Sequence, residues 1–182
     1  MAHIPSALSR AGFCLLVAGL MLSFGPRQVW SHGAVADQPL AEVQVKGAFL
    51  FNFARFVTWP AADRPLAICV ADNPALIAAT AEIVRGRMVE GRAVVARGLT
   101  SGLADDCDLL YLGDLKAEDA AAILSRVSGP VLTVGATPRF LRDGGMVRVF
   151  LDGNRMRFQV NRRQTDAAGL KISSQLLALA SQ

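Results

Sequence analysis

The stretch from Phe49 to Pro60 reads FLFNFARFVTWP and holds four of the nine phenylalanines of the chain. Apolar residues recur at helical spacing before it and through it, which predicts one long helix from Pro39 to Thr58. Proline disfavours the α conformation of the residue before it, so Trp59-Pro60 is expected to end the helix. The helix is apolar on two adjacent faces, which predicts that most of it lies in the core.

Outward from this helix, short apolar runs alternate with helical patterns. Strands are predicted at 66–70, 93–96, 107–112 and 131–134, and helices at 74–84 and 117–127. Two further runs, 146–151 and 155–160, are joined by the turn signal Asp152-Gly153-Asn154, which predicts a hairpin. This order predicts an α/β domain: a three-layer sandwich with a mostly parallel sheet, an antiparallel hairpin at one edge, and helices on both faces.

The C-terminal part shows helix-capping signals. Asn161 with Gln164 resembles a capping box, Gly169 interrupts the helix that follows, and Ser173-Ser174 is expected to cap a last helix through about Ala180. No internal repeat or linker divides the chain.

The N-terminus has the features of an export signal. Arg10 precedes an uncharged, mostly apolar tract from Ala11 to Pro26, which is shorter than the roughly 20 residues that span a bilayer. Ala34-Val35-Ala36 fits the small-x-small pattern of a signal peptidase site. We therefore predict a cleaved signal peptide over 1–36, a single domain over 37–182, and export to the periplasm; the alternative is an uncleaved anchor.

Loss of the leader removes much of ordinary enzyme chemistry. The two histidines, His3 and His32, lie in it, so the remainder has no Ser-His or Cys-His pair and no imidazole metal ligand. We expect no catalytic residues, no metal and no cofactor. The net charge falls from +4 to +2 when Arg10 and Arg27 leave, which offers no basis for nucleic-acid binding. An enzyme that uses carboxylates alone is the weakest hypothesis, because no pair of acids stands out.

Asn52 has two interpretations. Phe49, Asn52, Phe56 and Trp59 follow helical spacing, so the amide lies inside an aromatic stripe. In the favoured interpretation Asn52 is buried and bonds to the backbone of a neighbouring loop, as buried polar side chains usually do. In the alternative, aromatic walls and the amide hold a small molecule.

Cys69 lies in one predicted strand and Cys107 begins another, and the two strands could be neighbours. A disulfide is therefore preferred over two free buried thiols. Asp105, Asp106 and Asp108 lack the spacing of a calcium loop, and a solvated turn is expected. Gly144-Gly145 leads into a strand rather than a helix, which favours a tight turn over a phosphate site.

Several stretches together resemble the periplasmic YfiR-like family. They are VKGAFLFNFARFVTWP (Val45 to Pro60), Cys69, Gly91-Arg92, Cys107, GGMVRVF (Gly144 to Phe150) and FQVNRRQTDAAGLKISSQLLALA (Phe158 to Ala180). The last is the most specific, with an asparagine that opens a helix and then Gly-Leu-Lys-Ile-Ser-Ser. The family-motif positions, structural or interacting, are Asn52, Phe56, Trp59, Pro60, Gly144, Gly145, Asn161, Gly169, Ile172 and Ser173.

The resemblance implies a secreted α/β domain, often dimeric, with a disulfide between Cys69 and Cys107. It further implies a repressor that binds the periplasmic sensory domain of an inner-membrane diguanylate cyclase and is sequestered by an outer-membrane lipoprotein, with cyclic di-GMP signalling and biofilm formation as its output. The chain departs from the name-giving member in having no cysteine after Cys107, so a second disulfide is absent.

Two functions from different classes follow. The leading hypothesis is a non-catalytic periplasmic regulator that binds a membrane signalling protein. The alternative is a periplasmic small-molecule binding module, serving a histidine kinase or an outer-membrane transporter. A filled space beneath Phe49 and Trp59 would argue against the alternative.

Overall fold

A computed structural model describes residues 37–99, 104 and 106–181, with side chains from Glu42 onward. The described residues all belong to one compact unit, Gly33–Gln182. The predicted leader lies outside the described residues, so cleavage near Ala36 stays a prediction. No helix in the described part is long and apolar enough to cross a bilayer.

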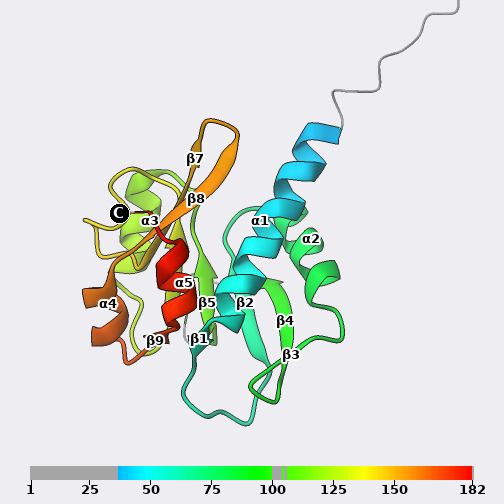
Figure 1. Cartoon of the computed structure of the whole chain (residues 1–182), viewed down its shortest axis with the longest axis vertical. Helices are drawn as coiled ribbons and strands as arrows, with labels where there is room; N and C mark the ends of the chain where they lie inside the picture. Colours follow the sequence, from blue (N-terminus) through cyan, green and yellow to red (C-terminus); the bar gives the residue numbers. More distant parts are fainter. Residues whose placement is uncertain (1–36, 100–103, 105, 182) are drawn as a thin grey trace, which may run out of the picture. The chain divides into compact units, whose positions relative to one another are not determined.

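The main sheet has seven strands in the order β3-β4-β2-β5-β6-β7-β8 (Figure 1). The strands are β2 (Leu66–Val70), β3 (Met88–Val89), β4 (Arg92–Gly98), β5 (Leu109–Tyr111), β6 (Leu132–Gly135), β7 (Val147–Asp152) and β8 (Arg155–Val160). The five inner strands are parallel, and β3 and β8 pair antiparallel at the two edges. The predicted fold class is therefore confirmed, and a second edge hairpin, β3–β4, is added to it.

The strand order is that of a doubly wound sheet. The chain enters the main sheet at the inner strand β2, crosses through α2 (Pro74–Val84) to β3 and β4, and then returns past β2 to β5 and β6. Such an order places the helices of the two halves on opposite faces, and it creates a crevice at the carboxyl ends of the strands where the direction reverses.

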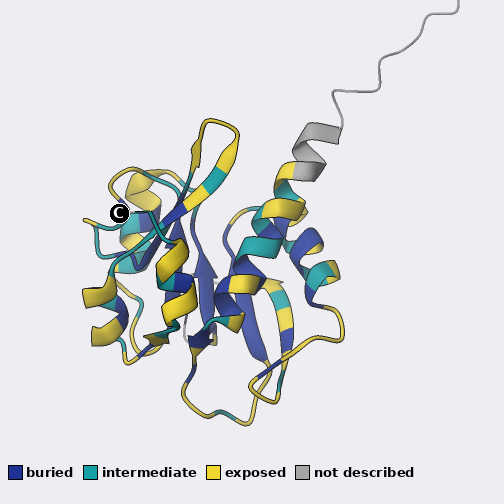
Figure 2. Cartoon of the chain, viewed as in Figure 1, coloured by how far each residue is buried: buried dark blue, intermediate teal, exposed yellow. Residues whose placement is uncertain are grey.

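Side chains that alternate along the strands form two separate cores, one on each face of the sheet. On the α1 face, Ile68, Leu109 and Leu132 pack under α1 (Asp37–Arg55), α2 and α5 (Ser174–Leu179). On the α3 face, Ala67, Cys69 and Leu110 pack under α3 (Ala117–Leu124). Figure 2 shows β2 and β5 as continuously buried, whereas β4 and the β7–β8 hairpin carry exposed residues. The sheet and the helices that cover its two cores form the three-layer sandwich expected from the sequence.

The long helix ends earlier than its sequence pattern predicts. α1 stops at Arg55, and Val57–Thr58 forms a short strand, β1, that pairs antiparallel with β9 (Lys171–Ile172). The Trp59 indole N–H donates to the carbonyl oxygen of Ala54 at 2.9 Å, which satisfies a group left free at the helix end. Tertiary pairing therefore ends the helix before proline does.

The caps predicted at Asn161 and Ser173 are confirmed, and Asn73 is a further cap. The side-chain oxygen of Asn73 accepts from the backbone N–H of Leu76 at 2.9 Å at the start of α2. Asn161 accepts from the N–H of Gln164 at 3.3 Å and opens α4 (Arg162–Ala167). Ser173 caps α5 in the same manner, through the N–H of Leu176 at 3.2 Å.

The disulfide is confirmed on the α3 face. Cys69 in β2 and Cys107 ahead of β5 are bonded, with their Cα atoms 5.8 Å apart, so the free-thiol alternative is wrong.

Phe140 on the same face is fully buried against Gly135 and Gly145, where an added Cβ would lie 2.3 Å and 2.2 Å from the ring. Gly145 therefore serves close packing, while Gly144 supplies the positive φ of +97° expected for the turn.

The expectation of a solvated acidic turn is wrong for Asp108. Its side chain is buried and accepts hydrogen bonds from Arg64 at 2.7 Å, Arg92 at 2.9 Å and the backbone N–H of Ala67 at 2.8 Å. This pairing ties the start of β2 to β5, because a buried carboxylate is stable only with such partners. Asp106 is exposed as expected, and Asp105 lies outside the described residues.

Candidate functional site

An apolar cavity on the α1 face lies between α1, β8 and α5. Its volume is about 450 Å³, within the usual range for small-molecule sites. Three segments far apart in the sequence line it: the end of α1, the second strand of the hairpin, and the last helix. The lining residues are Phe49, Asn52, Phe53, Arg55, Phe56, Arg155, Met156, Arg157, Phe158, Leu176 and Leu179.

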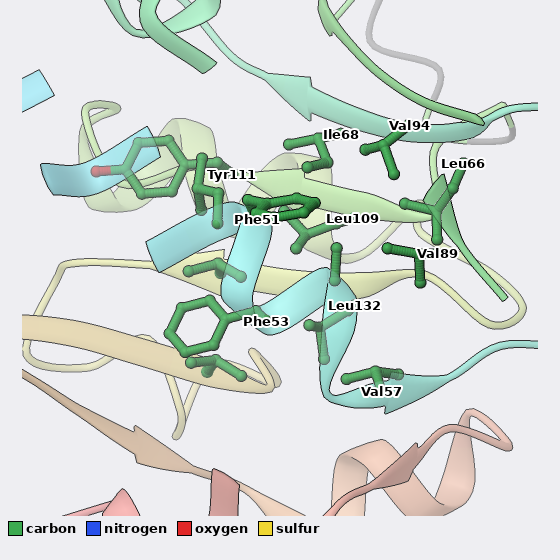
Figure 3. Packing of buried hydrophobic residues seen from close by; sticks show 14 of the residues in the cluster. Phe51, Phe53, Val57, Leu66, Ile68, Val89, Val94, Leu109, Tyr111 and Leu132 are labelled. Carbon is green, nitrogen blue, oxygen red and sulfur yellow. The ribbon is translucent and has the colours of Figure 1, made fainter. Parts of the chain in front are cut away.

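Three phenylalanine rings form the wall of this cavity. Phe53 and Phe158 are buried, and their ring centroids lie 5.2 Å apart in an edge-to-face arrangement. Phe49 packs edge-on against both, at 6.0 Å from Phe53 and 6.4 Å from Phe158. Figure 3 shows the Phe53 ring reaching from α1 over the sheet. Because edge-to-face packing holds each ring in place, the wall is preformed.

Asn52 is the clearest correction to the sequence interpretation. Its side chain is exposed and lines the cavity, and among the described residues it makes no hydrogen bond to a loop. The helix turns its neighbours Phe51 and Phe53 inward instead, at 6% and 1% exposure. The favoured interpretation as a buried amide is therefore wrong, and the alternative geometry, an amide among aromatic walls, is the one observed.

The rim of the cavity is cationic. Arg55, Arg155 and Arg157 line it, and no aspartate or glutamate does. The Arg55 guanidinium lies 5.6 Å from the ring centroid of Phe56. Arg157 pairs with Asp152 at 2.8 Å in an exposed contact, whereas Arg155 forms no ion pair with any described carboxylate. An aromatic wall, a free amide and three guanidinium groups together favour an anion with an apolar body.

A second polar cluster lies at the crevice where the doubly wound sheet reverses direction. Asp114 accepts hydrogen bonds from Asn73 at 2.8 Å and from Lys46 at 3.2 Å, and Lys46 also pairs with Glu42 at 3.0 Å. A cavity of about 430 Å³ lies nearby, between the loops after β2 and β4. Lys46, Glu42 and Asp114 are thus paired with one another, so these three groups have little unused hydrogen-bonding capacity for a ligand.

Two ionisable groups in this cluster are perturbed. Burial works to lower the pKa of Lys46, but its hydrogen bond to Glu42 and the neighbouring Asp114 outweigh that effect and raise the pKa above its ordinary value. Burial and the charge of Asp114 raise the pKa of Tyr111 to about 12. Lys46 is thus a stable cation and Tyr111 a neutral phenol, and neither is poised for proton transfer near neutral pH.

The structure separates the family-motif positions into two groups. Asn52 and Phe56 line the cavity. Trp59 is buried and donates its backbone N–H to Glu90 at 3.2 Å, and Pro60 follows it on the surface. Trp59 does not line the cavity that Phe49 lines. The predicted aromatic stripe is therefore split: Trp59 belongs to the core, whereas Phe49, Asn52 and Phe56 line the cavity.

The remaining motif positions shape the chain behind the cavity. Ile172 pairs with Val57, and the N–H of Ser173 donates to the carbonyl oxygen of Phe56 at 2.9 Å. Gly169 has a positive φ of +74° where α4 ends, and the Asn161 amide also donates to the carbonyl oxygen of Leu141 at 3.2 Å. These residues hold α5 against α1, and their role beyond this stays a prediction.

Sequence reasoning missed the arginines of the rim. The alternation of Met156 and Phe158 with Arg157 indicated an edge strand with two different sides, but nothing in the linear sequence places that strand beside α1.

No group of three or more His, Cys, Asp or Glu side chains in the described part could hold a metal ion.

No curated protein matches the chain. The model of the YfiR/HmsC-like family, DUF4154, matches residues 43–181, which is well over half of the chain and nearly all of the described domain. The match includes α1 from Val43 onward, the disulfide, the hairpin and the C-terminal motif from Asn161 to Ser173. The chain therefore belongs to the YfiR/HmsC-like family.

Proposed function

We propose that this protein is a non-catalytic periplasmic regulator that binds the periplasmic sensory domain of an inner-membrane signalling protein, and that it represses a diguanylate cyclase. The family match over 43–181 carries the proposal, because the family suggests regulators of diguanylate cyclase signalling. The export signal read from residues 1–36 and the absence of histidine after His32 support it.

Such a regulator needs no catalytic group. It shifts its receptor between two states by binding one of them more tightly. A tenfold change in output requires a difference of about 1.4 kcal/mol between the two affinities, which a modest surface supplies. Release from the receptor by an outer-membrane lipoprotein, and action as a homodimer, belong to the same proposal.

The test is made in the bacterium that carries the gene. Deletion is expected to raise cyclic di-GMP and biofilm formation, and the full chain supplied in trans is expected to restore both. Residues 37–182 expressed without the leader are the matched control, because a domain retained in the cytoplasm cannot reach a periplasmic receptor.

Crosslinking of the exported chain should recover an inner-membrane diguanylate cyclase. Unchanged cyclic di-GMP after deletion, together with recovery of a histidine kinase or a transporter instead, would contradict the repression of a cyclase and favour the alternative pathways.

A further inference from the structure

We propose that the outer edge of β4, over residues 95–98, binds an extended acidic segment of a partner protein, which adds to the main sheet as a further strand. The inference rests on the proposed function for the source of that segment, the periplasmic domain of the signalling protein. It adds the surface and the chemistry by which the two proteins recognise each other.

The C-terminal part of β4 has no strand neighbour on its outer side among the described residues (Figure 1). On its inner side β4 pairs with β2 along residues 94–98, whereas on its outer side β3 pairs only with Arg92 and Ala93. The chain reaches this outer side only after the turn at Gly86, which has a φ of +69°. An added strand can therefore continue the line that β3 occupies for two residues.

Backbone groups on the open side point away from the sheet. The N–H of Val94 donates outward to the carbonyl oxygen of Arg87 at 3.0 Å. Because successive residues of a strand direct their backbone groups to opposite sides, the N–H and C=O groups of Ala96 and Gly98 also point outward. Such an edge is a template for another strand, and many proteins bind extended peptides in this manner.

Apolar side chains next to this edge are exposed. Val95 is 38% exposed and Met88 is 60% exposed. Val95 lies beside Ala67 of β2 on the α3 face, and Met88 pairs with Ala93 on the same face. Figure 2 shows exposed residues along β4. An apolar side chain on the added strand, placed opposite Val95, would cover both exposed side chains.

Arg97 determines the charge of the partner segment. It is exposed on the same face as Val95, and it forms no ion pair with a described carboxylate. Its guanidinium donates to the backbone carbonyl oxygen of Asp106 at 2.6 Å, which leaves its charge uncompensated. Side chains directly opposite each other on paired strands lie about 5 Å apart, so an acidic residue opposite Arg97 forms an ion pair.

A second copy of the chain fits this edge less well. Antiparallel pairing of two β4 strands about Ala96 would place Arg97 of each copy opposite Val95 of the other. The two arginines would then be diagonal neighbours about 7 to 8 Å apart, without an acid between them. Charge complementarity therefore favours an acidic strand from a different protein.

The experiment titrates the purified exported protein with two seven-residue peptides that alternate threonine and valine. One peptide carries a single glutamate placed to face Arg97, and the other carries lysine at the same position. Hydrogen exchange followed by NMR is expected to slow at least tenfold at the amides of Ala96 and Gly98 in the glutamate complex, because an added strand bonds to them. No binding, or binding without this protection, would overturn the proposal.

A charge exchange tests the role of Arg97. The wild type is expected to bind the glutamate peptide about tenfold more tightly than the lysine peptide, and Arg97→Glu should reverse this preference. Arg126→Glu is the matched control, because it makes the same change at an exposed position after α3 and should keep the wild-type preference. If the two variants behaved alike, the net charge rather than this edge would set the preference, and the proposal would be wrong.

Ala96→Pro tests the backbone of the edge. Proline has no N–H, and edge strands tolerate it where that group faces away from the sheet, so the circular dichroism spectrum should stay that of the wild type. The affinity for the glutamate peptide should fall at least tenfold, and wild-type affinity in the folded variant would overturn the proposal. If the variant failed to fold, the charge exchange would decide the question alone.

Two further outcomes separate this surface from its alternatives. A wild-type dimer that Ala96→Pro dissociates, with no peptide bound by either chain, would overturn the proposal in favour of pairing between two copies. Raised cyclic di-GMP in the deletion strain, together with full repression by Ala96→Pro and Arg97→Glu, would overturn this surface and leave the proposed regulation standing.

Discussion

The two faces of the sheet are filled in different ways. On the α1 face, long aromatic and aliphatic side chains from α1, α2 and α5 cover the strands and leave a cavity of about 450 Å³ at one side. On the α3 face, small side chains such as Ala67, Ala71 and Ala120 pack closely, Phe140 fits between two glycines, and a disulfide joins two segments.

The difference indicates which face of the sheet has room for a binding site. Small side chains bury little apolar area, so the α3 face depends on close approach and on a covalent link. The rings of the α1 face bury far more area each, and they can stabilise the fold while leaving space beside them. We therefore expect changes in the core of the α3 face to reduce stability alone, and changes beside the cavity to affect binding.

The largest expected effect on stability is loss of the disulfide. The bond closes a loop with a sequence separation of 38 residues, and the double variant Cys69→Ala/Cys107→Ala is expected to lose about 4 kcal/mol of unfolding free energy, measured by urea denaturation. A reducing agent should destabilise the wild type and leave the double variant unchanged. If the reductant affected both chains equally, the α3 face would not depend on the covalent link.

The next effect compares two neighbours in α1. Phe53→Ala removes a buried ring of 1% exposure and is expected to cost about 3 kcal/mol, whereas Asn52→Ala should change the free energy of unfolding by less than about 0.5 kcal/mol. Both are measured in the same urea titration. A loss of about 2 kcal/mol for Asn52→Ala would instead indicate a buried hydrogen-bonded amide and would remove the distinction between wall and rim.

The smallest effect concerns Tyr111, whose ring belongs to the core of the α1 face. Its pKa is raised to about 12 in the folded protein, from about 10 in the unfolded chain, so the native state holds the proton more tightly. Its contribution to stability is complete below about pH 10 and is lost as the pH rises towards about 12.

At about pH 11 the wild type should have lost about 1 kcal/mol more than Tyr111→Phe, which cannot ionise at this position. Lys46, whose pKa is also raised, contributes a loss of the same sign, and its share is smaller in the variant because the charge of Tyr111 is one cause of that raised pKa. Equal pH dependence of the two chains would show that the phenol is not responsible.

Much of the architecture follows from local signals. The buried run LAICV, the cap Asn73 before Pro74, and the turn Asp152-Gly153-Asn154 each identify an element without tertiary information, because strand burial, capping and hairpin turns depend on adjacent residues. The disulfide between Cys69 and Cys107 was accessible in the same way, since both cysteines mark strands of one sheet.

The predictions that proved wrong involve partners distant in the sequence. Asp108 looked like part of a solvated turn because its partners, Arg64 and Arg92, are far from it along the chain. The end of α1 was placed too late because the strand that pairs with Val57 is more than a hundred residues away. Asn52 was assigned to the core because helical spacing identifies a stripe but not the stripe that faces the sheet.

By itself the sequence determined the family, the alternation of strands and helices, and the caps that begin the helices, since these depend on the order and periodicity of neighbouring residues. Only the tertiary structure decided that the hairpin and the last helix meet the end of α1, and so gather Asn52, Arg155 and Leu179 around one space. The physical reason is that a cavity consists of the volume that packed elements leave unfilled, and that volume depends on how distant segments pack together.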